Sequence, residues 1–303
     1  MTPETATNKP GKDECADSAE LAGEEHRSRP TAAALGGLDN TAGAGLLPDV
    51  RTIEMFGLFA LGIATATTIQ TPDSVLEVSR ANPRQLRRAL RVTLNSFDLA
   101  GIKTGLLSSE VIVDAIAGDL TSLFKGILVV DPVLVSSDGK QLLNFQGRAT
   151  LIKKLFPITS VVTPNVDEAG LFCDTKIDSP RDVEHVAASL LKLGPKTVVV
   201  KCSGRFGGAD YLMTEDSAGE WIPAQTELAM QESEIHTHGT GCFHSAALLS
   251  LLLLGKNIKE AAQKAKLLTE CAILTSRKIK GFEARLIDHF ALEPSVRECL
   301  RGD

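Results

Sequence analysis

The 303-residue sequence has no hydrophobic run long enough to cross a membrane, because its longest apolar stretch covers only residues 246–254 and is interrupted by Ser250. A membrane-spanning helix needs about 20 consecutive apolar residues, so this stretch predicts a buried helix of a folded domain. The sequence also lacks a basic excess, since 32 Lys and Arg stand against 38 Asp and Glu. We therefore expect neither nucleic acid nor an anionic membrane as a partner.

The six cysteines form no CxxC pair, and the chain begins without the apolar stretch of a secretory leader. Extracellular domains rely on disulfides, whereas scattered cysteines in a long chain indicate reduced thiols and a cytoplasmic protein. Residues 1–30 are polar and lack apolar periodicity, so they are expected to form a disordered N-terminal extension. Residues 31–303 contain no recognisable linker or repeat, which predicts a single domain.

Apolar β-rich segments alternate with amphipathic helical segments through the rest of the chain. Strands are expected at Thr31–Gly36, Phe59–Thr68, Leu99–Thr104, Gly126–Asp131, Ser160–Thr163 and Lys196–Lys201. Helices are expected at Arg84–Phe97, Ser109–Phe124 and Pro180–Leu193, with proline or serine at their starts and Gly194 after the last. This alternation predicts an α/β fold with a mainly parallel sheet and helices on both faces. In such folds ligands bind at the carboxyl ends of the strands.

Residues 236–244, HTHGTGCFH, combine three histidines, one cysteine and two glycines immediately before the long apolar helix. Glycines at a helix start let several backbone N–H groups point at one anion, and the helix end adds partial positive charge. Gly239, Thr240 and Gly241 therefore predict a cradle for a phosphoryl group. In the first helical turn Cys242 is expected to have a lowered pKa, so that its thiolate can act as a general base.

Two other interpretations of this stretch remain open. The histidines and Cys242 could bind zinc, although their spacing differs from the usual patterns and the glycines would have no role in such a site. Alternatively, the stretch is an ordinary helix start with a buried structural cysteine.

Further polar residues follow the predicted strands. Asp131 ends a buried strand, and Asn165 stands three residues before Glu168; oxygen ligands of this kind suit Mg²⁺, directly or through water. An Asp–Pro pair is equally typical of a turn, and the Asn165–Glu168 spacing of a helix capping box. Lys201 can meet a phosphate as a point charge. Gln70 offers a donor and an acceptor that suit an N–C–NH₂ edge, or it is a plain strand-end side chain.

Together these motifs resemble those of the hydroxymethylpyrimidine/phosphomethylpyrimidine kinases of thiamine synthesis, members of the ribokinase-like superfamily. THGTGC at 237–242 is similar to the family's anion-hole signature, whose last position is an aspartate base in most of the superfamily. Further family motifs resemble the segments at 36–53, 62–75, 102–112, 129–139 and 161–172. The resemblance implies a ribokinase-like three-layer α/β/α fold and phosphorylation of 4-amino-5-hydroxymethyl-2-methylpyrimidine, its monophosphate, or both, with ATP and Mg²⁺.

The resemblance also implies a role for each matching residue. Cys242, Gly239, Thr240 and Gly241 would be catalytic; Asp39, Gly45, Gln70, Leu106 and Val133 would contact the pyrimidine; Asn165 and Lys201 would bind nucleotide; and Asp131 and Glu168 would organise Mg²⁺. Leu106 replaces the usual methionine, and Cys202, Ser203 and Arg205 replace a Gly-Gly-His nucleotide loop.

Residues 258–273 resemble the helix that forms one wall of the family's adenine pocket. Many family members are dimers, which implies a homodimer. Two alternatives remain: a pyridoxal kinase of the same superfamily, and a non-catalytic pyrimidine-binding protein.

Overall fold

The structure, a computed structural model, describes residues 29–226 and 236–301. Residues 1–28 of the expected N-terminal extension lie outside this described part, and the expectation of a single domain over residues 31–303 stays a prediction. The first strand begins at Thr31, as predicted.

A sheet of nine strands forms the middle layer of the described chain, in the order β3-β2-β1-β4-β5-β6-β7-β8-β9. The strands are β1 (Thr31–Asp39), β2 (Phe59–Gln70), β3 (Val75–Arg80), β4 (Leu99–Thr104), β5 (Ile127–Val130), β6 (Val161–Val162), β7 (Thr197–Val200), β8 (Asp210–Thr214) and β9 (Glu220–Ile222). The six inner strands β2, β1, β4, β5, β6 and β7 pair in parallel, whereas β3, β8 and β9 run antiparallel at the two edges. The predicted mainly parallel sheet is confirmed.

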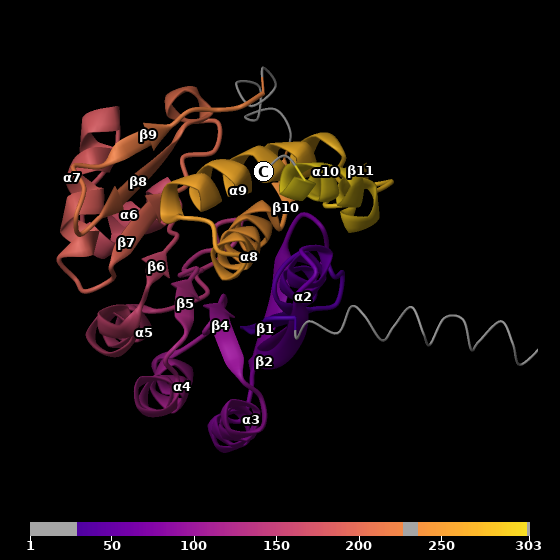
Figure 1. Ribbon diagram of the computed structural model, residues 1–303. Helices are drawn as coiled ribbons and strands as arrows, with labels where there is room; N and C mark the ends of the chain where they lie inside the picture. Colours follow the sequence, from indigo (N-terminus) through magenta and orange to yellow (C-terminus); the bar gives the residue numbers. More distant parts are fainter. Residues whose placement is uncertain (1–28, 227–235, 302–303) are drawn as a thin grey trace, which may run out of the picture.

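Helices cover both faces of this sheet (Figure 1). One face carries α3 (Pro83–Ser96), α4 (Glu110–Leu123), α5 (Phe145–Thr150), α6 (Val166–Cys173) and α7 (Pro180–Leu191). The other carries α2 (Leu46–Met55), α8 (Thr240–Leu253), α9 (Ile258–Leu274) and α10 (His289–Arg301). Side chains alternate between two cores, because Ala33 and Leu35 of β1 join the first and Ala32 and Ala34 join the second. This is the three-layer α/β/α fold that the resemblance implied.

Shorter elements connect these layers. A π-helical turn (Leu151–Leu155) and a 3₁₀ turn (Phe156–Ile158) continue α5, and another 3₁₀ turn covers Phe206–Gly208. A small sheet of β10 (Thr237–His238), β12 (Arg285–Leu286) and β11 (Arg277–Lys278) lies beside the start of α8.

The expected helix start signals are confirmed. The Ser109 side chain accepts a hydrogen bond from the Ile112 N–H at the start of α4. Pro83 is the first residue of α3, and Pro180 follows the Ser179 cap of α7. Local sequence therefore determines where these helices begin.

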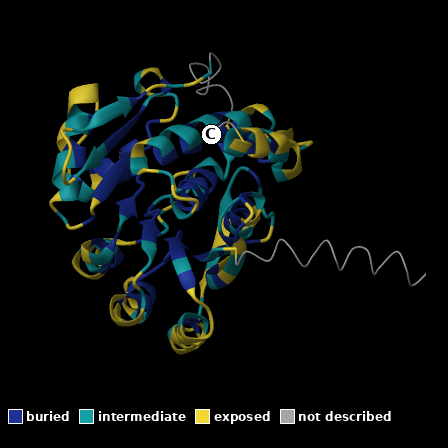
Figure 2. Ribbon diagram, in the orientation of Figure 1, coloured by how far each residue is buried: buried dark blue, intermediate teal, exposed yellow. Residues whose placement is uncertain are grey.

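The apolar run at 246–254 lies within α8 and its last cap residue, with every residue from Phe243 to Leu251 buried (Figure 2). A helix that is apolar all round must be enclosed by other elements, and here the sheet, α2 and α9 enclose it. In the described ranges, no helix has the length and apolar character that a membrane span requires.

Candidate functional site

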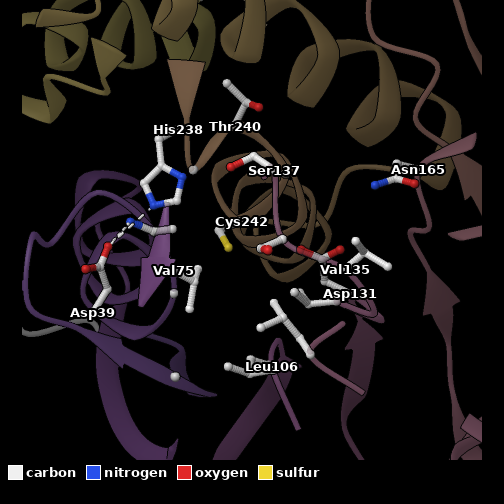
Figure 3. Close-up of a pocket in the computed structure, with 18 of the residues that line it drawn as sticks. Asp39, Val75, Leu106, Asp131, Val135, Ser137, Asn165, His238, Thr240 and Cys242 are labelled. Atoms are coloured by element: carbon white, nitrogen blue, oxygen red, sulfur yellow. Dashed lines mark hydrogen bonds and ion pairs between the residues drawn. The ribbon is translucent and has the colours of Figure 1, made fainter. Parts of the chain in front are cut away.

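A cavity of about 530 Å³ opens where the carboxyl ends of the parallel strands meet the start of α8 (Figure 3). All the candidate site residues line it: Asp39, Gly45, Gln70, Leu106, Asp131, Val133, Asn165, Glu168, Lys201, Gly239, Thr240, Gly241 and Cys242. They come from segments as far apart in the sequence as Asp39 and Cys242, which the parallel sheet brings to one edge.

The Gly239–Gly241 segment has the backbone that an anion cradle requires. Gly239 is the N-cap of α8 with a φ of 88°, and a Cβ at this position would overlap the carbonyl oxygen of Gly43. Thr240 and Gly241 begin the helix, where the first N–H groups have no partner within the helix. These N–H groups, together with the helix dipole, can bind one anion at the cavity.

Replacing Gly239 with alanine is expected to lower the free energy of unfolding by more than the roughly 1–2 kcal/mol of a left-handed alanine. The added strain comes from the overlap with Gly43. Gly255, at the other end of α8, is a matched control because it has a φ of 85° and a methyl group added there would meet no atom within 4 Å. Urea unfolding of both variants measures the difference, and equal losses would show that the overlap relaxes without penalty.

Beneath the cradle lies a network of buried charges. The ammonium of Lys103, fully buried, donates to both oxygens of Asp49 at 2.8 and 2.7 Å and lies 3.9 Å from Asp131. Lys201 donates to the other Asp131 oxygen at 2.8 Å, and the Ser245 hydroxyl donates to Asp131 at 3.1 Å. Burial opposes the charge of Lys103, but the charges of Asp49, Cys242 and Asp131 together outweigh burial and raise the Lys103 pKa. No motif in the sequence marks Lys103, Asp49 or Ser245 as site residues.

The prediction that the Cys242 pKa is lowered is wrong. Burial raises the pKa of this thiol to about 11, and the charges of Asp49 and Asp131 add to the rise. Lys103 and a hydrogen bond from the Gly45 N–H act in the opposite direction without reversing it. The sulfur borders the cavity, yet protein surrounds it on its other sides, so loss of solvation outweighs the field of the helix end.

Asn165 and Glu168 form a capping box at the start of α6 and also face the cavity. The Asn165 side chain accepts from the Glu168 N–H at 2.8 Å, and Glu168 accepts from the Asn165 N–H at 2.9 Å. The other Glu168 oxygen accepts from the Leu134 N–H at 3.1 Å. Burial raises the pKa of Glu168 to about 7; the charge of Lys201 opposes this rise and that of Asp131 adds to it.

The carboxylates of Asp131 and Glu168 fit a hydrated divalent cation. Both are buried at the cavity, and their charges repel one another, so a nearby cation would stabilise the charged form of each. Their oxygens already accept hydrogen bonds, which favours contact through water. Within residues 29–226 and 236–301, no group of three or more His, Cys, Asp or Glu side chains could enclose a metal by itself.

Two of the three histidines in the 236–244 stretch lie near different carboxylates. His238 Nε2 lies 3.6 Å from Asp39 Oδ2, whereas His244 Nε2 lies 3.6 Å from Asp210 Oδ2. The side chains that zinc would need therefore diverge, and the geometry does not support the zinc interpretation.

The opposite wall of the cavity is built around Asp39 and Gln70. Asp39 accepts hydrogen bonds from the N–H groups of Thr41, Gly43 and Ala44 at 2.7, 3.1 and 2.9 Å. Burial raises the Asp39 pKa, but the interactions with His238, Thr41 and Gln70 together outweigh burial, so the pKa is lowered. Asp39 thus holds the glycine-rich turn in place, and the buried Gln70 side chain is near enough to help lower its pKa.

Apolar residues complete this wall. Leu106 is buried and packs against Gly37, where a Cβ would lie 2.9 Å from a Leu106 methyl group. The Val133 N–H donates to the Asp131 carbonyl oxygen at 2.9 Å, which fixes the loop after β5. The wall therefore offers an apolar surface with one primary amide, a combination suited to a small polar heterocycle.

A second cavity of about 130 Å³ adjoins the first and shares Asn165, Lys201, Thr240 and Gly241 with it. Ser203, Asp210, His244, Lys266, Thr269 and Ile273 line the rest of it. The last three belong to α9, the helix expected beside an adenine pocket. Arg205, in the altered loop, turns outward to bind Asp167 at 3.1 Å.

Known proteins are similar to this chain in both sequence and fold. The hydroxymethylpyrimidine/phosphomethylpyrimidine kinase of Aquifex aeolicus is 31% identical over 253 residues, covering 83% of this chain and 98% of that protein. The enzyme of the same name from Haemophilus influenzae is 30% identical over 237 residues, covering 77% and 86%.

Solved structures show the same relationship. Phosphomethylpyrimidine kinase from Clostridium difficile has a TM-score of 0.69 at 29% identity, covering 81% of this chain and all 100% of its own. The pyridoxal kinase from Staphylococcus aureus, in complex with pyridoxal, has a TM-score of 0.77 at 26% identity, covering 87% and 94%. The same S. aureus enzyme has been solved with the ATP analogue AMP-PCP and pyridoxal.

The sequence pattern of the family described as phosphomethylpyrimidine kinase matches residues 39–284, which is most of the described chain. This span contains the glycine-rich turn, both strand-end carboxylates and the anion cradle that together form the cavity. From this match and these relatives we conclude that the chain is a kinase belonging to the phosphomethylpyrimidine kinase family.

Proposed function

We propose that this enzyme transfers a phosphoryl group from ATP to 4-amino-5-hydroxymethyl-2-methylpyrimidine and then a second one to the resulting monophosphate. The observation that supports this most is the continuity of one cavity, from the Gly239–Gly241 cradle to the amide of Gln70. The relatives named for both kinase activities support both steps.

In this proposal the N–H groups of Gly239, Thr240 and Gly241 stabilise charge on the transferring phosphoryl group. Lys201 adds a positive charge beside the cradle, held in place by Asp131 at 2.8 Å. Mg²⁺, held through water by Asp131 and Glu168, would neutralise phosphate charge. Gln70 and the loop at Val133 orient the pyrimidine.

Cys242 takes the proton of the substrate hydroxyl in the first step. Because burial raises its pKa to about 11, only a small fraction of the free enzyme holds the thiolate at neutral pH. The charge of Lys103, directly beneath, is the protein group that most favours this fraction. The second step needs no such base, since its acceptor is a phosphate.

In this proposal ATP binds at the second, smaller cavity, with its terminal phosphate at Thr240 and Gly241, which line both cavities. Residues of α9 form the outer wall there. We also propose a cytoplasmic homodimer, as the family resemblance implies. Among the described residues, Cys173, Cys202, Cys242 and Cys271 form no disulfide, which agrees with a reducing compartment.

Release of ADP by the purified enzyme tests the proposal directly. With Mg²⁺ and ATP, we expect turnover of the hydroxymethylpyrimidine and of its monophosphate, each above a reaction without acceptor. Pyridoxal is the third acceptor to test, because the fold is so similar to that of the S. aureus pyridoxal kinase. Turnover of pyridoxal alone would overturn the proposal, and turnover of the monophosphate alone would restrict it to the second step.

Replacing Gln70 with leucine is expected to weaken binding of the pyrimidine about tenfold, because its amino edge would lose a buried hydrogen-bonding partner. Affinity for AMP-PCP should stay the same, since Gln70 does not line the second cavity, where ATP is proposed to bind. Gln85→Leu, on the exposed side of α3, controls for the change in side-chain chemistry. Calorimetric titration gives both affinities, and equal losses for the two ligands would indicate a folding defect instead.

A further inference from the structure

The two acceptors of the proposed function differ in charge. The hydroxymethylpyrimidine brings a neutral hydroxyl, whereas the monophosphate brings a phosphate with about −1.5 to −2 charges at neutral pH. The cavity already contains the carboxylates of Asp39, Asp131 and Glu168. The second step therefore needs a positive group near the acceptor that the first step does not need.

The two lysines nearest the cradle, Lys201 in the cavity wall and the fully buried Lys103, are already engaged. Lys103 binds both oxygens of Asp49, and Lys201 donates to Asp131 at 2.8 Å. Each ammonium thus balances a carboxylate of the protein itself, and Lys201 also stands beside the phosphoryl cradle. Besides the Mg²⁺ of the proposed function, a cationic side chain at the acceptor phosphate would therefore help to offset its charge.

His238 lies where such a group would act, between the pyrimidine wall and the cradle. It precedes Gly239, lines the cavity, and packs against Gly43, where a Cβ would lie 2.9 Å from its ring. Its Nε2 is buried and lacks a hydrogen-bond partner among the described residues, 3.6 Å from Asp39 Oδ2. Figure 3 shows one edge of the ring turned to Asp39 and the other facing the side of the cavity where Thr240 and Ser137 lie.

Asp39 is suited to support a positive charge on this ring. Its carboxylate is fixed by the N–H groups of Thr41, Gly43 and Ala44, so it stays charged and does not move away. On the neighbouring strand β12, Arg285 directs its guanidinium to the Ser276 carbonyl oxygen at 3.2 Å. Asp39 is thus the charged group that pairs with the imidazole.

We propose that His238, as an imidazolium supported by Asp39, binds the phosphate of the pyrimidine monophosphate and so permits the second phosphorylation. This inference rests on the proposed function and assigns the two steps different requirements. The first acceptor uses the amide of Gln70 and the base at Cys242. The second acceptor additionally uses a charge-assisted hydrogen bond from His238.

His238→Gln tests the inference, because glutamine keeps an amide donor that can reach Asp39 but cannot carry a positive charge. We expect kcat/KM for the monophosphate to fall about tenfold or more, mainly through KM, while kcat/KM for the hydroxymethylpyrimidine changes by less than about threefold. In calorimetry without ATP, the Kd of the monophosphate should rise by a similar factor. His185→Gln, exposed on α7, controls for loss of an imidazole anywhere on the protein.

Two results of these measurements would contradict the inference. Equal losses for both acceptors in His238→Gln would indicate a structural role and overturn the inference. An unchanged Kd for the monophosphate would overturn it as well. Failure of the proposed function itself would appear in the wild type, as no turnover of either pyrimidine.

Discussion

The Cys242→Ser enzyme is expected to phosphorylate the hydroxymethylpyrimidine about 100-fold more slowly than the wild type, the effect of losing a positioned base. Serine occupies nearly the same volume, so the affinity for the pyrimidine should be retained. Its hydroxyl holds its proton far more tightly than a thiol and cannot accept one from the substrate. Single-turnover rates and calorimetry on the same preparation measure the two quantities.

The pH profile identifies the base more directly. Because burial raises the Cys242 pKa to about 11, the thiolate fraction increases with pH throughout the neutral and mildly alkaline range. Since kcat/KM reports the free enzyme, it should rise about tenfold per pH unit between roughly pH 7 and 9 with the hydroxymethylpyrimidine. Cys242→Ser should lack this rise. A flat wild-type profile, or full activity of the serine variant, would exclude Cys242 as the base.

Lys103→Met is expected to lower the free energy of unfolding by about 3–5 kcal/mol, the range found when one partner of a buried ion pair is removed. Lys103 and Asp49 are both fully buried, and the variant would leave the Asp49 carboxylate without its counter-charge. Urea unfolding followed by circular dichroism gives the loss. The same variant should reduce turnover of the hydroxymethylpyrimidine, because Lys103 favours the Cys242 thiolate.

Two further variants show whether the stability loss in Lys103→Met comes from leaving a buried charge unpaired. Lys103→Met combined with Asp49→Leu removes both charges and should recover most of the lost stability, since apolar replacements for a buried pair are well tolerated. Lys259→Met removes a lysine from an exposed pair with Glu220 and should cost less than about 1 kcal/mol. Similar losses for Lys103→Met and Lys259→Met would mean that the buried pair contributes no special stability.

Much of the central sheet could be predicted from local patterns. The strand at Leu99–Thr104 has the predicted bounds, and the strand predicted at 126–131 contains β5. β5 could be recognised because a strand buried on both faces has a continuous apolar sequence. The antiparallel edge strands were not identified. β3, for example, reads VLEVSR and is largely exposed, so it lacks the apolar run that marked the inner strands. The helix α2 was overlooked because its segment was interpreted only as a glycine-rich turn.

The positions of the site residues were predictable, but their electrostatics were not. Strand ends and a glycine-rich helix start point to one edge of the sheet, and the candidate residues do meet there. Lys103 is a single lysine in an apolar strand, and its partner Asp49 lies 54 residues away, so no spacing links them. The pKa of Cys242 depends on burial and on such distant charges, which no local pattern contains.

The enclosure of α8 determines how the cradle responds to ionic strength. At physiological salt, counter-ions screen exposed charges over about 8 Å, which weakens surface pairs such as Lys259–Glu220. The body of α8 from Phe243 to Leu251 is out of contact with solvent, so ions cannot approach the peptide dipoles along its length. The cradle is screened only from its open end, and a phosphate that fills that end displaces the ions there. The cradle should therefore still attract an anion at salt concentrations that abolish the surface ion pairs.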